Sequence, residues 1–170
     1  EAGFVPLTTI WQHQGITRRV QVPNAVPGVT ARSMEAEDTS AIAALDTRAY
    51  GAARDRTLRE LLRLSDGMVV ERDDTICGFA LRRRFGRGWV VGPVVAETED
   101  IAMMLAAPLI KRSEGEFVRL DTPEDSEKFN AFLSAIGMGV YDTVTEMYLG
   151  RQRRPLDGPR MFGLAAHSLG

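Results

Sequence analysis

The chain has 170 residues, of which 44% are hydrophobic and 26% are charged, and this size suits one compact domain. Its 21 basic and 23 acidic residues leave a formal net charge of -2, which does not favour nucleic acid as a partner. The single cysteine, Cys77, excludes an intrachain disulfide, and the apolar runs are too short to span a bilayer. We therefore expect a soluble cytoplasmic protein that binds neither nucleic acid nor membranes.

The N-terminal segment differs from the rest of the chain. Residues 4–12 are rich in β-branched and aromatic side chains, which predicts a strand. Gly15, Pro23, Pro27 and Gly28 follow with no helical period between them, and this indicates a linker. A strand of this kind without its own domain could pair with another chain, so a homodimer is one expectation.

From residue 29 onward, strand and helix patterns alternate. Strands are predicted at residues 29–34, 68–71, 76–84, 89–96, 117–120 and 140–149, and residues 161–169 favour a further strand. Four helices are predicted, beginning at Asp38 or Thr39, after Gly51, near Glu97 and at Ser126. Pro108 is expected to bend or end the third of them. This order predicts an α/β fold in which a mixed, mainly antiparallel sheet carries helices on both faces.

Several segments resemble the GNAT (GCN5-related) N-acetyltransferase superfamily. Residues 89–96 resemble the family's fourth strand, whose backbone holds the pantetheine arm of acetyl-CoA, and Pro93 matches a common proline there. Residues 131–138 resemble the family's late helix, and residues 1–6 look like the end of the same helix once more. The resemblance implies three parts in a bacterial tandem GNAT protein: a tail strand of a preceding GNAT domain (1–22), a linker (23–28) and the C-terminal GNAT-like domain (29–170).

The second domains of such tandem proteins carry similar local segments. Here they are Asp46, Tyr50, Gly51 and Arg54, the strand Val91–Ala96, and Asp121 with Pro123. The resemblance implies that acetyl-CoA contacts the backbone of Val91, Gly92, Val94, Val95 and Ala96. It also implies that Tyr50 and Arg54 line an acceptor pocket for a small-molecule or peptide amine.

The family's pyrophosphate loop is not preserved. Counting from Pro93, its usually small positions fall on Glu97, Glu99 and Ile101, and no glycine lies between Gly92 and Gly115. Two like charges about 4 Å apart repel by about 4 kcal/mol at an effective dielectric near 20, so these acids disfavour a phosphate. The same acids could instead complement the dipole of the following helix. The tyrosine that often serves as the family's general acid is also missing, since Leu133 occupies its position.

Three residues are candidates for catalysis. Asp121 ends a strand and could act as a general base, although a turn residue bonded to the backbone is the alternative. Glu146 could point into the cleft or into solvent, and Tyr148 could replace the missing acid if it faced the cleft. The two acceptor-pocket residues also have alternatives: Tyr50 could serve in packing, and Arg54 could form a surface salt bridge. His13 and His167 stand far apart without metal-ligand spacing, so no metal is expected.

Three functions follow from these features. In the first, the intact protein transfers an acetyl group from CoA to an amine, and this domain shapes the acceptor site with a degenerate CoA loop. In the second, the domain is a non-catalytic module that binds a small ligand or supports a partner domain or dimer. In the third, the domain binds acyl-CoA itself through an unusual loop.

Overall fold

The computed structural model describes residues 3–150 and 157–169. These residues form one eight-stranded sheet of order β2-β3-β4-β5-β6-β1-β7, and β8 pairs with β5 beside this path. The strands are β1 (Phe4–Ile16), β2 (Thr30–Ser33), β3 (Asp66–Arg72), β4 (Thr75–Phe85), β5 (Gly88–Ala96), β6 (Phe117–Thr122), β7 (Val140–Leu149) and β8 (Arg160–Gly163). The helices are α1 (Thr39–Tyr50), α2 (Asp55–Leu64), α3 (Glu99–Lys111) and α4 (Glu127–Ala135), and a short 3-10 turn, η1 (Ala36–Asp38), precedes α1.

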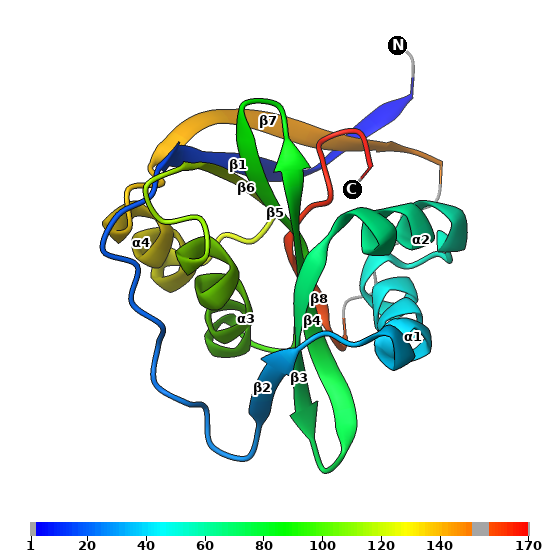
Figure 1. Cartoon of the computed structure of the whole chain (residues 1–170). Coiled ribbons are helices and arrows are strands. Elements are labelled where there is room, and N and C mark those ends of the chain that lie inside the picture. The colour runs from blue at the N-terminus through cyan, green and yellow to red at the C-terminus, as the bar shows by residue number, and fades with distance from the viewer. Residues whose placement is uncertain (1–2, 151–156, 170) are drawn as a thin grey trace.

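Helices cover both faces of the sheet, as the sequence predicted. Helices α1 and α2 lie on one side and α3 and α4 on the other (Figure 1). Side chains alternate between the faces along each strand, so Phe79 and Leu81 join the core under α1 and α2. Ala80 and Val91 join the second core under α3 and α4. Pairing is antiparallel at every described strand pair except β5 with β6, which confirms a mixed, mainly antiparallel sheet.

Strand β1 lies inside this sheet, with antiparallel partners on both sides. It pairs with β6 from Trp11 to Ile16 and with β7 from Phe4 to His13. It is longer than predicted, because Gly15 lets the strand continue where any Cβ would overlap the carbonyl oxygen of Gly137. The edge facing β7 is paired over most of β1, whereas the edge facing β6 is paired only in its C-terminal part. The described pairing with β6 begins only at Trp11, so the expectation that this strand pairs with another chain stays a prediction.

The helix ends agree with the sequence at two places and differ at two. Gly51 ends α1 with a φ of 84°, and the Oγ of Ser126 accepts the backbone N–H of Phe129 at 3.1 Å at the start of α4. Neither Asp38 nor Thr39 caps α1 through its side chain. The start of α3 is capped by Thr98, which the sequence analysis did not select, and the helix continues past Pro108 to Lys111.

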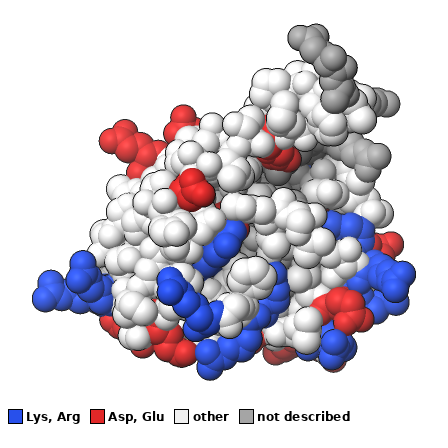
Figure 2. Space-filling model, turned by 90° about the horizontal axis from the view of Figure 1, so that it is seen from above, with Lys and Arg blue, Asp and Glu red and all other residues white. Residues whose placement is uncertain are grey.

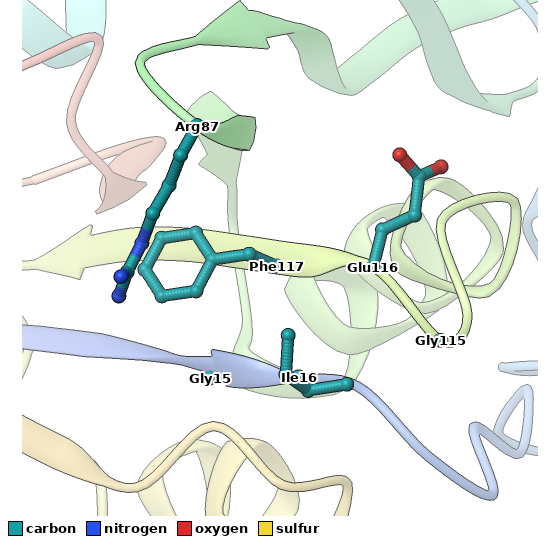
Figure 3. A pocket seen from close by; sticks show the side chains of 6 residues that line it. All are labelled: Gly15, Ile16, Arg87, Gly115, Glu116 and Phe117. Carbon is teal, nitrogen blue, oxygen red and sulfur yellow. The ribbon is translucent and has the colours of Figure 1, made fainter.

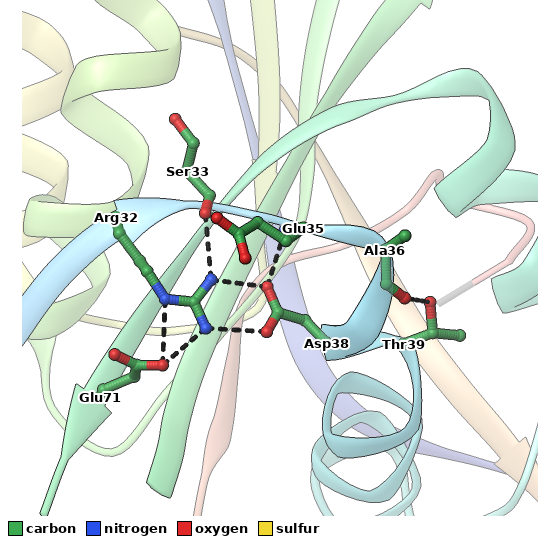
Figure 4. Close-up of polar contacts among 7 residues, drawn as sticks. All are labelled: Arg32, Ser33, Glu35, Ala36, Asp38, Thr39 and Glu71. Carbon is green, nitrogen blue, oxygen red and sulfur yellow. Dashed lines mark hydrogen bonds and ion pairs between the residues drawn. The ribbon is translucent and has the colours of Figure 1, made fainter. Parts of the chain in front are cut away.

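Asp38 instead belongs to an ion cluster that joins β2, β3 and the entry to α1 (Figure 4). The Arg32 guanidinium donates to both carboxylate oxygens of Asp38, at 2.7 and 2.8 Å, and to Glu71 at 2.6 Å. Asp38 also accepts the backbone N–H of Glu35 at 2.7 Å. The Arg32 hydrogen bonds hold the pKa of the Asp38 carboxyl below its usual value, against the opposing effect of burial.

We predict that Asp38→Asn lowers the free energy of unfolding by about 1–2 kcal/mol at pH 7, because it weakens charge-assisted hydrogen bonds at a buried carboxyl. The folded-state pKa of Asp38 is depressed, so its contribution is present above the unfolded pKa of about 4 and is lost as the pH falls through the folded value. Urea unfolding at pH 7 and pH 3 measures this difference. Glu37→Gln, at an exposed neighbour, is the control, and an equal effect of both variants would contradict the assignment.

Candidate functional site

Strands β5 and β6 run side by side for only a short distance. Their parallel pairing joins Trp89 to Val118 and Val90 to Arg119, and beyond this point the two strands diverge. The gap that opens between them contains β8, which pairs antiparallel with Val94, Val95 and Ala96 of β5. The five β5 residues expected to contact acetyl-CoA are all buried; they are Val91, Gly92 and residues 94–96. The backbone at residues 94–96 faces the chain's own C-terminal segment.

The start of α3 is the place where the family would hold a pyrophosphate, and its polar groups already have partners. The Oγ1 of Thr98 accepts the backbone N–H of Ile101 at 3.3 Å. Glu97 pairs with Arg72 at 2.7 Å, and the hydroxyl of Ser126 donates to Glu99. Lys128 pairs with Asp100 at 2.6 Å. A phosphate would meet three carboxylates and no glycine backbone here, so these residues do not fit CoA.

At the end of β6, two polar side chains, Arg119 and His167, meet around the buried carboxylate of Asp121. The Asp121 side chain is 1% exposed and receives two hydrogen bonds from Arg119, from Nε at 2.9 Å and from Nη2 at 2.8 Å. The Nε2 atom of His167 lies 3.3 Å from the same carboxylate and 3.3 Å from Arg119. Asp121 therefore forms a buried ion pair and is not the turn residue of the alternative reading. The backbone N–H of Glu124 bonds to Thr122 instead.

A hollow of about 320 Å³ lies beside this cluster, and we call it the β7 pocket. Tyr50 of α1, Ile10 of β1 and the end of the chain form its walls together with β7. Its full lining is Ile10, Tyr50, Val144, Thr145, Glu146, Met147, Leu164, His167 and Ser168. The pocket brings together two residues predicted from the sequence, Tyr50 and Glu146. Asp121 reaches it only through His167.

Arg54 lies behind the pocket wall and does not line the pocket. It forms a buried ion pair with Asp46, in which Nε and Nη2 donate to the carboxylate at 2.7 and 2.8 Å. Its guanidinium also lies 4.3 Å from the centroid of the Tyr50 ring and donates to the carbonyl oxygen of Leu169. Arg54 therefore holds both Tyr50 and the end of the chain, which line the pocket. The sequence-based alternative was a surface salt bridge, whereas the ion pair with Asp46 is buried.

The remaining candidates lie apart from this pocket. Tyr148 is partly buried on β7 but does not line the pocket.

Burial raises the pKa of the Cys77 thiol, which disfavours the thiolate that a nucleophile would need. Within residues 3–150 and 157–169, no group of three or more His, Cys, Asp or Glu is placed to hold a metal ion. In the same part of the chain, no helix is both long and apolar enough to cross a membrane.

A second hollow, of about 560 Å³, opens at the other end of β1 and β6. Figure 3 shows the Arg87 side chain beside the Phe117 ring, with the guanidinium 4.0 Å from the ring centroid, and the Glu116 side chain directed away from it. Glu116 pairs with Arg84 at 3.1 Å. Seen from above, basic side chains gather in the lower half of the view with acidic ones among them (Figure 2). This second hollow offers a cation and a ring but none of the predicted site residues.

Sequence reasoning missed two members of the Asp121 cluster. Arg119 stands two residues before Asp121 on the same strand, so alternation alone places both side chains on one face. His167 follows β8 by a few residues and carried no comparable signal, because only the pairing of β8 with β5 brings it to Asp121.

The comparisons with known proteins agree with this fold. A family model described as an acetyltransferase (GNAT) domain matches residues 42–163. The chain belongs to the GNAT acetyltransferase family. This family uses acetyl-CoA. An uncharacterized N-acetyltransferase of Bacillus subtilis, YitH, is 25% identical over 141 residues, which are 81% of this chain and 49% of the relative.

Solved GNAT structures share the fold at lower identity. A putative acetyltransferase from Pyrococcus horikoshii superposes with a TM-score of 0.68 at 18% identity, covering 98% of this chain and 53% of that one. A tandem GNAT protein from the clavulanic acid biosynthesis pathway gives a TM-score of 0.57 at 15% identity, covering 81% of this chain and 53% of that one. The GNAT domain described here thus spans about half the length of these relatives.

We predict that Asp121→Asn lowers the free energy of unfolding by about 2–3 kcal/mol, because it leaves the Arg119 guanidinium without its charge partner in a largely buried place. Chemical denaturation at neutral pH measures the change. The control is Asp125→Asn, at an exposed position of the following loop, where we expect a change within about 0.5 kcal/mol. Equal stability of the Asp121 variant and the native chain would show that the ion pair adds nothing to the fold.

Proposed function

We propose that this GNAT domain supplies the acceptor site of an N-acetyltransferase and that the β7 pocket binds a small-molecule or peptide amine. The observation that carries the proposal is the position of Glu146 among mostly apolar and hydroxyl-bearing neighbours. A protonated amine that leaves water for such a hollow needs a negative partner there, and a carboxylate meets this need with a charge-assisted hydrogen bond. Ile10, Val144 and Leu164 provide contacts for a short apolar body.

The Asp121 cluster gives the pocket a group that can take a proton. An amine must lose a proton before or while it attacks an acyl carbon, and an imidazole is suited to accept one near neutral pH. His167 lines the pocket, whereas Asp121 lies behind it and is held by Arg119. We therefore assign proton acceptance to His167 and the positioning of its ring to Asp121. This changes the sequence-based role of Asp121 from base to positioning residue.

The acyl donor belongs to another part of the protein under this proposal. The start of α3 carries three acids, and the β5 backbone beyond Val91 faces β8. The relatives are about twice as long as this chain, which leaves room for a second domain. We assign acetyl-CoA to a preceding GNAT domain, of which residues 1–22 would be the tail strand, and residues 23–28 would be the linker.

The same pocket also supports the second candidate, a ligand-binding module without catalysis. The polar groups at the start of α3 already have partners within the domain, which favours this candidate for the domain taken alone. The two candidates share the ligand class, an amine at Glu146, and differ in whether the amine is acetylated in the longer protein. Turnover by a longer form that includes the preceding region, together with its loss in His167→Ala, would distinguish catalysis from binding alone.

We predict that small primary amines shift the backbone amide resonances of residues 144–147 and 167–168 of this chain, and that Glu146→Gln weakens their binding about tenfold. The reason is the loss of the single negative side chain among the described residues that line the β7 pocket. Titration by NMR, with the matching alcohols as neutral probes, measures both effects.

The matched control is Asp142→Asn, which removes an exposed carboxylate from the same strand at a position outside the pocket. We expect this variant to bind amines as the native chain does. Equal binding of amines and alcohols, or equal weakening by both variants, would refute the assignment of the pocket to an amine.

A further inference from the structure

The gap between β5 and β6 is filled by main chain. Val94 and Gly163 are register partners, as are Val95 with Met161 and Ala96 with Arg160. On the other side of the gap, the backbone N–H of Leu164 donates to the carbonyl oxygen of Asp121 at 2.8 Å. We call residues 160–165 the C-terminal insert. It satisfies backbone groups of both diverging strands, which would otherwise be buried without partners.

The side chains of the insert complete both hydrophobic cores. Phe162 is fully buried, and its ring stands edge-on to Phe129 of α4 at 5.6 Å between centroids. Met161 and Leu164 are buried with residues of α1 and α2 on the opposite face. The insert therefore belongs to the packed interior on either side of the sheet.

Backbone contacts hold the insert close to β5 beyond the paired residues. A Cβ at Gly92 would overlap the carbonyl oxygen of Leu164, so the absence of a side chain there allows the two segments to touch. The Arg83 guanidinium bridges them, because it donates to the carbonyl oxygens of Gly92, at 2.9 Å, and of Ala165. Arg83 is 7% exposed, and among the described residues no carboxylate pairs with it. A buried cation held by two carbonyl groups ties the insert to β5.

We propose that the C-terminal insert is a built-in replacement for an acyl-CoA in this gap, so that the domain excludes acyl-CoA from the β5 backbone. The pantetheine arm of CoA is an extended chain with amide groups, and it would need the same backbone donors and acceptors that the insert uses. The insert is covalently attached, which gives it an effective local concentration on the order of 1 mM or more before any contact is counted. A free ligand must compete with this tether and also displace the buried side chains. The inference is independent of the amine assigned to the β7 pocket.

The first test uses the full chain. Acetyl-CoA is titrated up to about 5 mM in calorimetry, and hydrogen exchange of the insert amides, that of Leu164 in particular, is followed with and without it. We expect no binding and no change in exchange. Binding accompanied by faster exchange of the insert amides would overturn the proposal, because it would make the insert a displaceable gate.

The second test asks whether the gap is a strand-binding site at all. A protease recognition sequence replaces residues 151–156 in the full chain, and the folded protein is cut there. We expect the fragment 157–170 to remain bound through gel filtration and to exchange only with an added peptide of the same sequence. Acetyl-CoA at the same concentration should not release it. Spontaneous loss of the fragment, or release by acetyl-CoA, would contradict the proposal.

Two variant peptides make this exchange specific. A peptide with Phe162→Ala should compete at least 100-fold more weakly, because it lacks the ring buried against Phe129. A peptide with Asp157→Asn, altered at an exposed residue before the insert, should compete within about threefold of the native peptide. Equal competition by both variants would mean that the fragment is not held in the gap as described.

Discussion

The divergence of β5 from β6 is the constraint on which the rest of the molecule depends. Two parallel strands that separate in the middle of a covered sheet leave backbone N–H and C=O groups without partners. Something extended must lie between them, and in this chain it is β8. That placement carries residues 164–169 across the end of β6, sets His167 beside Asp121 and builds one wall of the β7 pocket. The candidate site is thus a consequence of how the sheet is completed.

The central part of the fold could be predicted from local sequence. The strands around residues 68–71, 76–84 and 89–96 and the tight turns between them follow from alternation and turn chemistry, and the helix ends at Gly51 and Ser126 follow from capping. Local sequence does not contain the partner of a strand, however. The placement of β1 between β6 and β7 and of β8 between β5 and β6 arises from pairings across more than 60 residues. The shorter length predicted for β1 and the omission of His167 both have this origin.

The candidate site shows the same division. Tyr50 and Glu146 were selected as residues near a cleft, and they do line one pocket. Arg54 was selected with them, but its guanidinium is engaged by Asp46 and by the end of the chain. Asp121 was selected as a base, yet it is buried against Arg119, and in the proposed site it positions a histidine that follows β8. Residue type and position in an element predicted where polar groups gather, while the role of each group depended on its partners.

The two edge strands of the sheet differ in how readily they could pair with a further strand. At one edge, β2 has only four residues, and Arg32 on it is engaged by two carboxylates. At the other edge, β7 has ten residues, and several of its apolar side chains are exposed, namely Val140, Tyr141, Val144, Met147 and Leu149. A long apolar edge strand is a template for further pairing, whereas a short, charged one is not. An association that extends this sheet would therefore add strands at the β7 edge and not at the β2 edge.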